Sequence, residues 1–510
     1  MAKKQVALVL SGGVSLGSYI AGALDELLAA LAAASDDYEI DIITGASAGA
    51  TTAALIAHSL LYRNGVTALH HVWVEDVDMV DLLAPTVPPT EGLSLLSGQR
   101  LVEVAHQEIA WPAGTVPQRA AICAPRLTVA MTLANVTALQ YVSRVPEQAP
   151  GRPEAFAQLR NSEQQTFRLG PEVAPTDPLW ANMATVARAS AAIPFVFPLV
   201  QLPREATNPD HYIQQPSFSG SARFWYYDGG TFNNLPIDLA AWFATEVGDL
   251  ANRVVIVINP WRNAATPVAP VTPRPNLFMV AGSLLTALMN ESTALQFERE
   301  VLHRPLASVP VGVSGPDGVA ALPPPLPPSP PPPPDPDGLE RALPGLDRAA
   351  VDVLRRIALV MPRPTDLPLR GNHLHAMAAF LDRRFREYDF RRGAADAQAT
   401  AREVLGISYP APQAAAYYQP ETDPNLTADL SAYERLGDLP SSHAGAAGRS
   451  VRQVFEDALT ARIVALIHAW NAPGPDFLFD PVLIATIPSL VRGQLPLLWP
   501  SRGAQGHREP

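Results

Sequence analysis

Cysteine is almost absent from this 510-residue chain, which contains only Cys123. A single thiol cannot form an intramolecular disulfide or a cysteine-based metal cluster, so the fold must be held together without either. One thiol is also compatible with a reducing compartment. Charged residues are scarce at 17% of the chain, and acidic residues outnumber basic ones, which gives a formal net charge of −12. The sequence therefore lacks the basic excess of a nucleic-acid-binding protein, and we expect no nucleic-acid partner.

Long uninterrupted apolar runs are lacking as well. The first apolar segment, Val6–Leu10, is too short for the core of a signal peptide. Of the two longest candidates, Leu277–Met289 is too short to span a membrane, and Phe477–Trp499 is broken by charged residues and prolines. We therefore expect a soluble, cytoplasmic protein, with peripheral association as its closest contact with a membrane.

Proline, in contrast, is abundant, with 53 residues in the chain. Eleven of these prolines fall within the 14 positions 323–336. Such a run offers almost no amide donors to a helix or a sheet, and it favours an extended, solvated polyproline II conformation. We therefore expect residues 306–338 to form a linker or a surface loop. Recognition by a proline-binding protein domain is the alternative use of this run.

The residues beyond the proline run show helical patterns. Ser450 and Gln453 have the spacing of a capping box, and apolar residues recur behind them at helical spacing as far as Trp470. The sequence therefore predicts an α/β unit over residues 1–305, the linker, and a mainly helical C-terminal region over residues 339–510.

The N-terminal segment alternates between strand and helix patterns. Val6–Leu10 and Ile40–Ile43 are short apolar runs, and helical spacing follows each of them, over Ser18–Leu31 and Ala48–Leu61. This order predicts a parallel sheet covered by helices. Further strands are expected at Arg126–Thr132, Gln140–Arg144, Gln164–Leu169, Phe224–Tyr227 and Val254–Asn259, and further helices at 70–82, 97–109, 178–190, 236–247 and 277–302.

A glycine-containing loop, Ser11–Gly17, joins the first strand to the first helix. A P-loop would need lysine where Ser18 stands, and a dinucleotide-binding fingerprint would need glycine where Val14 stands. Neither of these two interpretations survives. The remaining interpretation is an anion-binding loop whose backbone amides point at negative charge near the start of a helix. A tight turn without a ligand is the alternative.

A second chemistry-bearing segment is Gly45–Gly49, which has the pattern Gly-x-Ser-x-Gly between a strand and a helix. A nucleophile elbow needs small neighbours, because its serine adopts a strained conformation close to the surrounding backbone. The pattern therefore predicts that Ser47 is a nucleophile at the start of a helix, with Gly45 and Gly49 as the small residues that the turn requires.

A serine nucleophile needs a base. Asp228 follows the predicted strand Phe224–Tyr227, and Gly229 and Gly230 come directly after it. Two glycines permit a tight turn that leaves the carboxylate open. The sequence therefore offers Asp228 as the base, whereas an ordinary Asp-Gly turn is the alternative.

These three segments, with Ala189–Pro198, resemble the patatin-like phospholipase family over about residues 5–260. The resemblance implies a three-layer α/β/α fold and hydrolysis of lipid acyl esters. It also implies a catalytic dyad in which Ser47 is the nucleophile and Asp228 is the general base. A lipid or acyl-ester substrate is then the expected partner, with no metal and no organic cofactor, while protein partners stay unknown.

The resemblance also implies that Gly12, Gly13 and Val14 form the oxyanion hole. The family usually has a third glycine and then a cation where this chain has Val14 and Leu16. We expect the valine amide to remain a donor with a negative φ. Loss of an oxyanion donor costs about 10²–10³ in rate, so weakened activity is part of this expectation.

Two alternatives to the dyad remain open. The first is a serine–histidine–aspartate esterase, for which the chain order would allow His373, His375 or His443 as the third member. The second is a catalytically weak protein of the same fold that binds or scaffolds partners through its C-terminal region.

Overall fold

The N-terminal apolar run forms strand β1 (Lys4–Leu10), which lies inside a mixed sheet. β1 pairs in parallel with β2 (Tyr38–Gly45) on one side and with β7 (Arg253–Ile258) on the other. The computed structural model describes residues 2–85, 94–112, 114–144, 155–247, 252–261, 287–288, 291–294, 358–362, 369–370, 376–409, 440–443, 445–446 and 448–471. Within these residues the sheet has eight strands in the order β5-β6-β3-β2-β1-β7-β8, with β4 paired to β3.

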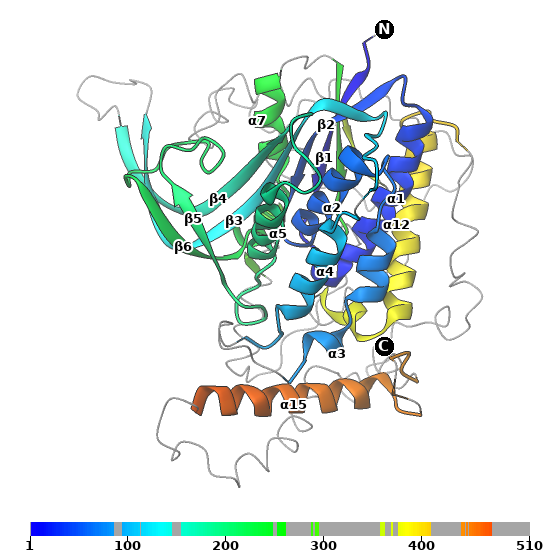
Figure 1. Ribbon diagram of the computed structural model, residues 1–510, viewed down its shortest axis with the longest axis vertical. Coiled ribbons are helices and arrows are strands. Elements are labelled where there is room, and N and C mark those ends of the chain that lie inside the picture. Colours follow the sequence, from blue (N-terminus) through cyan, green and yellow to red (C-terminus); the bar gives the residue numbers. More distant parts are fainter. Residues whose placement is uncertain are drawn as a thin grey trace, which may run out of the picture.

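The alternation of side chains along β1 builds the two faces of the sheet. Val6, Leu8 and Leu10 belong to the larger hydrophobic core, and Ala7 and Val9 belong to a second core on the opposite face. Helices α1 (Gly17–Ala33), α2 (Ala48–Tyr62) and α5 (Pro178–Ser190) contribute to the larger core, and α7 (Ile237–Val247) covers the second. The predicted three-layer α/β/α fold is therefore confirmed (Figure 1).

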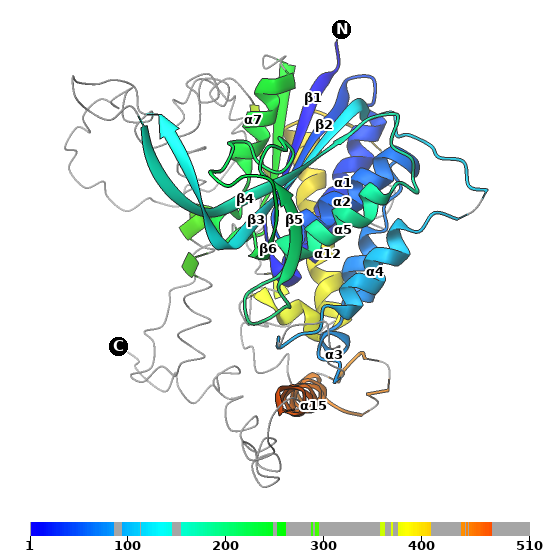
Figure 2. The same cartoon turned by 60° about the vertical axis from the view of Figure 1, so that its left-hand side comes forward.

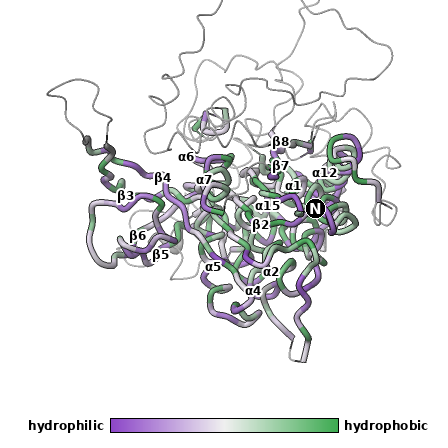
Figure 3. The backbone as a smooth tube through the Cα atoms, turned by 90° about the horizontal axis from the view of Figure 1, so that it is seen from above, coloured by the Kyte–Doolittle hydropathy of each residue, from purple (hydrophilic) through white to green (hydrophobic). Residues whose placement is uncertain are grey.

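Two of the predicted strands form a single continuous strand. Residues 126–132 and 140–144 both lie in β3 (Cys123–Arg144), a strand of 22 residues that forms a long hairpin with β4 (Ala155–Leu169). Figure 2 shows this hairpin extending from the body of the molecule. β6 (Ser221–Asp228) runs antiparallel to β3 and also pairs with β5 (Val200–Glu205), a strand that the sequence analysis missed. Seen from above, hydrophobic segments run through the body around β2 and α1 (Figure 3).

The helix expected over 70–82 is broken. The structure has a π-helical turn η2 (His71–Asp76) and then a short helix α3 (Met79–Leu82). Asp78 separates them, because its backbone is extended and its side chain accepts the Val80 amide as an N-cap. The expected helix over 97–109 is confirmed as α4 (Gln99–Ile109). The helix expected over 277–302 and the proline-rich run lie largely or wholly outside the described residues.

Residues that follow the proline-rich run return to the sheet. β8 (Ala358–Val360) pairs in parallel with β7, and α12 (Arg383–Glu403) lies beside α1 in both Figure 1 and Figure 2. The two helices approach closely at two glycines. A Cβ on Gly22 would collide with the backbone of Phe390, and one on Gly393 would collide with the backbone of Tyr19. The division of the chain at residues 305 and 339 stays a prediction, although this part of the C-terminal region completes the α/β/α layers.

The predicted capping box is present. The Gln453 amide donates to Ser450 Oγ, and the Ser450 amide donates to Gln453 Oε1 at 3.0 Å, at the start of α15 (Val451–Asn471). α15 lies below α3 in Figure 1. Its Arg462 is buried and donates to the backbone carbonyls of Ala84, Ser94 and Leu95. The C-terminal helix thus contacts the segment that joins α3 to α4.

Among the described residues, Val14–Ala33 is the one helical segment long and apolar enough to cross a membrane by length and composition. Its most apolar window has a mean hydropathy of 1.4, and 78% of that window is buried inside the fold. This burial is what the core helix of a globular domain requires.

Candidate active site

Ser47 lies at the turn between β2 and α2, where the sequence analysis predicts a nucleophile elbow. Its backbone has φ 51° and ψ −120°, a combination that residues other than glycine rarely adopt. The turn is tight because a Cβ on Gly45 would meet the Gly49 carbonyl, and one on Gly49 would meet the Leu10 carbonyl. The glycines that flank Ser47 thus allow three backbone segments to meet at one point.

The long strand β3 explains how Asp228 reaches Ser47. Gly45, at the end of β2, pairs with Met131, and β3 then continues beyond the end of β2. β6 runs back along this extension and ends where Asp228 pairs with Leu133, two residues beyond Met131. The end of an antiparallel strand therefore lies beside the carboxyl end of a parallel one.

The side chains of Ser47 and Asp228 are hydrogen-bonded. Ser47 Oγ donates to Asp228 Oδ2 at 2.5 Å, and the Gly230 amide donates to Asp228 Oδ1 at 2.7 Å. Asp228 is fully buried and Ser47 is 2% exposed. Burial raises the pKa of the Asp228 carboxyl to about 7, although the Ser47 and Gly230 donors favour its charged form.

The end of α5 and the loop behind it hold both members of this pair. Ser190 Oγ accepts the Ser47 amide at 2.9 Å, and the Ser190 carbonyl accepts the Gly229 amide at 3.0 Å. The Ala192 carbonyl accepts the Asp228 amide at 2.9 Å. These contacts give a physical role to the Ala189–Pro198 segment, which the sequence analysis included only through the family resemblance.

The glycine loop lies against Ser47, and its amides differ in their partners. The Gly12 amide donates to the Asn234 carbonyl at 3.0 Å, so it is not an open donor, contrary to the prediction. A Cβ on Gly12 would lie 3.1 Å from Ser47 Cβ. The amides of Gly13 and Val14 donate to no group within the described ranges. Among the described residues, they are the two amides of the predicted set without a protein acceptor.

Val14 departs from the expected conformation. Its φ is +52°, in the left-handed region, whereas we expected a negative φ. The chain must turn sharply from Gly13 into the short 3-10 turn η1 (Val14–Leu16), and the third glycine of the family pattern would adopt that conformation without strain. The side chain of Ser15 in this turn donates to the Ala376 carbonyl at 2.5 Å. Leu16, at the position of the family's cation, is fully buried.

A deep and mostly apolar cavity opens at Ser47. The centres of water-sized molecules can occupy about 110 Å³ of it, a volume smaller than the space that its walls enclose, and the cavity lies among α2, α4, α5 and η2. Val14, Ile193, Phe197 and Phe380 line the cavity along with Ser47. Such a cavity can hold an extended apolar group with its end at the Ser47 hydroxyl.

No histidine contacts Ser47 or Asp228 in the part of the chain that the structure describes. His443 lies elsewhere, with Nδ1 3.4 Å from Asp78 Oδ1. His373 and His375 lie outside the described residues. His58 lines the cavity on α2, and the sequence analysis did not single it out. Its spacing of three helical turns from Ser47 was the available signal.

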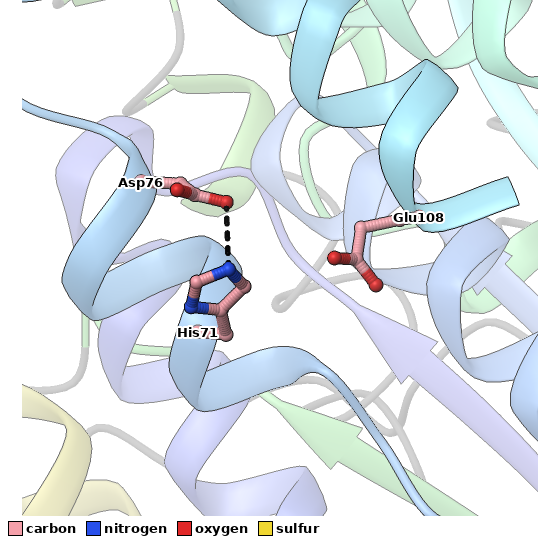
Figure 4. A group of neighbouring side chains, drawn as sticks. All are labelled: His71, Asp76 and Glu108. Atoms are coloured by element: carbon pink, nitrogen blue, oxygen red, sulfur yellow. Dashed lines mark ion pairs between the residues drawn. The ribbon is translucent and has the colours of Figure 1, made fainter. Parts of the chain in front are cut away.

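A separate group of side chains, His71, Asp76 and Glu108, has ligand atoms within 4.8 Å of one another (Figure 4). His71 Nε2 lies 3.4 Å from Asp76 Oδ2. Both carboxylates already have guanidinium partners, because Arg100 lies 2.8 Å from Asp76 and Arg63 lies 3.6 Å from Glu108. This arrangement is an ion-pair network, and it does not by itself indicate a metal site.

Comparisons with known proteins agree with the motifs. A family model for patatin-like phospholipases matches residues 8–241. No curated protein matches the chain. Among solved structures, the crystal structure of VipD from Legionella pneumophila is similar at 12% identity and a TM-score of 0.24, with 98% of this chain and 85% of that chain covered. The family match spans the glycine loop, the elbow and Asp228, so the whole candidate site lies within residues 8–241, the part of the chain that matches the patatin-like phospholipase family.

Proposed function

We propose that the protein is a serine lipid acyl hydrolase that uses Ser47 as the nucleophile and Asp228 as the general base. The observation that carries this proposal is the 2.5 Å hydrogen bond between Ser47 Oγ and Asp228 Oδ2 at the end of an apolar cavity. The hydroxyl is within the distance required for direct proton transfer, and the cavity suits the acyl chain of a carboxylic ester.

The first half of the reaction forms an acyl-enzyme. Ser47 Oγ attacks the ester carbonyl carbon while its proton moves to Asp228. The carbonyl oxygen becomes an oxyanion, and the open amides of Gly13 and Val14 are its donors. The carbon–oxygen bond to the leaving alcohol then breaks, and Asp228 returns the proton to that alcohol. A pKa of about 7 allows Asp228 to accept and release a proton at neutral pH.

The second half regenerates the enzyme. Asp228 takes a proton from water, and the resulting hydroxide attacks the acyl carbon. The bond to Ser47 Oγ breaks, Ser47 regains a proton from Asp228, and the carboxylic acid leaves. Each step needs one proton acceptor, so a histidine is not required. We therefore favour the dyad over the triad.

A catalytically weak binding protein is the second candidate, and one observation favours it. Leu16 is fully buried at the position of the family's cation, so the glycine loop gains no fixed positive charge from this side chain. Such a protein would keep the fold and the apolar cavity but would turn over esters poorly.

Labelling with a fluorophosphonate, read by intact mass and peptide mapping, tests the proposal. Wild type should gain one adduct on Ser47, Ser47→Ala should gain none, and Ser441→Ala, which removes a serine outside the cavity, should label like wild type. Hydrolysis of a short-chain p-nitrophenyl ester should accompany labelling. An unlabelled wild type that is folded by circular dichroism would support the binding protein instead.

A further inference from the structure

The cavity that begins at Ser47 follows one face of α2. Thr51, Leu55 and His58 line it at successive helical turns, with the i, i+4, i+7 spacing of neighbours on one face. The facing wall includes Trp180 and Ala184 of α5. An acyl chain attached to Ser47 would therefore lie along α2 and reach His58.

The surroundings of His58 are aromatic. Its ring centroid lies 5.1 Å from that of Tyr62, 5.9 Å from that of Trp111 and 4.9 Å from that of Trp180, and all three contacts are edge-to-face. A phenyl ring would fit among these three aromatic rings without burying a polar atom. The choice of an imidazole here therefore needs a separate explanation.

His58 is 3% exposed, and its Nε2 has no hydrogen-bond partner among the described residues. The polar groups beside it are engaged, because Ser59 Oγ donates to the Val66 carbonyl and Arg63 donates to the Glu108 carbonyl. Burial, with a contribution from Arg63, lowers the pKa of His58 to about 4. The ring is therefore neutral at pH 7, with one N–H donor and one acceptor nitrogen.

The position of His58 along α2 sets its distance from the reacting carbonyl. His58 is eleven residues after Ser47, which corresponds to about 16 Å of helix rise. An extended chain gains roughly 1.2 Å per bond, because three backbone bonds of a residue span at most about 3.6 Å. A span of about 16 Å corresponds to about 13 bonds. The first of these joins Ser47 Oγ to the ester carbonyl carbon, so the imidazole lies about a dozen bonds along an acyl chain from that carbon.

We propose that His58 determines specificity by hydrogen-bonding an oxygen of the acyl chain about a dozen carbons from the ester carbonyl. The substrate class is then the esters of long-chain fatty acids that are hydroxylated near that position. This inference rests on the proposed function, because the length of the chain is counted from Ser47.

Ricinoleate and oleate form a matched pair of probes, since ricinoleate differs by one hydroxyl on its twelfth carbon. The quantity to measure is the ratio of kcat/KM for p-nitrophenyl ricinoleate to that for p-nitrophenyl oleate. Wild type should favour ricinoleate about three- to tenfold, the value of one hydrogen bond. His58→Phe should bring the ratio to about one or below, and His58→Gln should restore part of the preference. His106→Phe makes the same substitution on the exposed face of α4 and should keep the wild-type ratio.

Equal ratios in wild type and His58→Phe would overturn the inference, and so would hydrolysis of a butyrate ester without hydrolysis of either long-chain ester. Calorimetric binding of free ricinoleate and oleate repeats the comparison without turnover. An inactive protein that binds ricinoleate more tightly, and loses this preference in His58→Phe, would support the subsite while rejecting the proposed hydrolase. A protein without the binding preference and without activity would reject both.

Discussion

The side chain of Ser190 holds the backbone of Ser47 through a 2.9 Å hydrogen bond from the Ser47 amide to Ser190 Oγ. Ser47 has a φ of 51°, which the surrounding structure must maintain. Ser190→Ala would leave the buried amide without its acceptor. We expect the free energy of unfolding to fall by about 1–3 kcal/mol. We also expect kcat for a short-chain ester to fall about tenfold with little change in KM, because the nucleophile is displaced and the acyl cavity is intact.

The control for Ser190→Ala is Thr400→Val on α12, which also removes a buried hydroxyl; unlike Ser190 Oγ, which accepts an amide, this hydroxyl donates to the Asp396 carbonyl. Thr400→Val should lower stability without changing kcat. Equal losses of kcat in the two variants would show that Ser190 acts only through general stability.

The pH dependence of turnover should follow Asp228. Burial raises the pKa of this carboxyl to about 7, and only the ionised form can accept the Ser47 proton. We therefore expect kcat/KM for a neutral ester to rise with pH to a plateau above neutrality, and to be about a hundredfold lower at about pH 5 than on that plateau. The measurement is a pH–rate profile with a substrate that does not titrate. A profile that is flat down to about pH 5 would contradict this assignment.

The stability of the fold should depend on the same carboxyl with a defined sign. The pKa is 3.8 in the unfolded reference and about 7 in the folded protein, so Asp228 contributes most to stability below about pH 4 and loses that contribution as the pH rises to about 7. Asp228→Asn does not titrate. The free energy of unfolding of this variant, relative to wild type, should therefore increase over this interval and then stay constant. Urea unfolding across the interval measures it, and a constant difference would reject the raised pKa.

At position 14, a glycine variant should be more stable than an alanine variant, which reverses the usual order of their stabilities. Glycine is ordinarily less stable than alanine at a structured position, but Val14 has a φ of +52°, which costs an L-residue about 1–2 kcal/mol. Val14→Gly should therefore be more stable than Val14→Ala by about 1 kcal/mol in urea unfolding. If Val14→Ala were instead more stable than Val14→Gly, the loop would have relaxed to a negative φ at this position.

The buried pair of Arg204 on β5 and Glu163 on β4 lies beside the strand that carries Asp228. Both side chains are fully buried, with nitrogen and oxygen 3.5 Å apart, and Tyr226 donates to Glu163 at 2.7 Å. Arg204→Met leaves the carboxylate buried without its cation and should cost about 3–5 kcal/mol of stability. Adding Glu163→Gln should recover part of this loss. A double variant less stable than Arg204→Met would contradict the pairing.

The sequence predicts those parts of the site that are local in the chain. The elbow around Ser47 and the turn after Asp228 depend on a few adjacent residues, and small residues are needed there by any chain that makes these turns. Short apolar runs predict β1 and β2, and apolar residues at helical spacing predict the helices that follow them, because these patterns are also local in the chain.

The missed features depend on contacts between distant segments. The role of Ser190 as the acceptor of the Ser47 amide is set by a partner far away in the sequence. The spacing of His58 from Ser47 places both on one face of α2, but it does not show that a cavity joins them. The φ of Val14 could not be predicted, since β-branched residues avoid positive φ and tertiary contacts override this preference. β8 has three residues and lies about a hundred residues after β7, so neither its length nor its position marks it as a strand.

The packing of α12 on α1 affects the order in which the fold can assemble during protein synthesis. The chain leaves the ribosome from its N-terminus, and the glycine loop and Ser47 emerge early. Yet Ser15 bonds to Ala376, and α1 is covered by a helix that ends at Glu403. The outer side of α1 therefore stays uncovered until Glu403 has left the ribosome, and the glycine loop gains its contact with Ala376 only after more than 300 further residues have followed it.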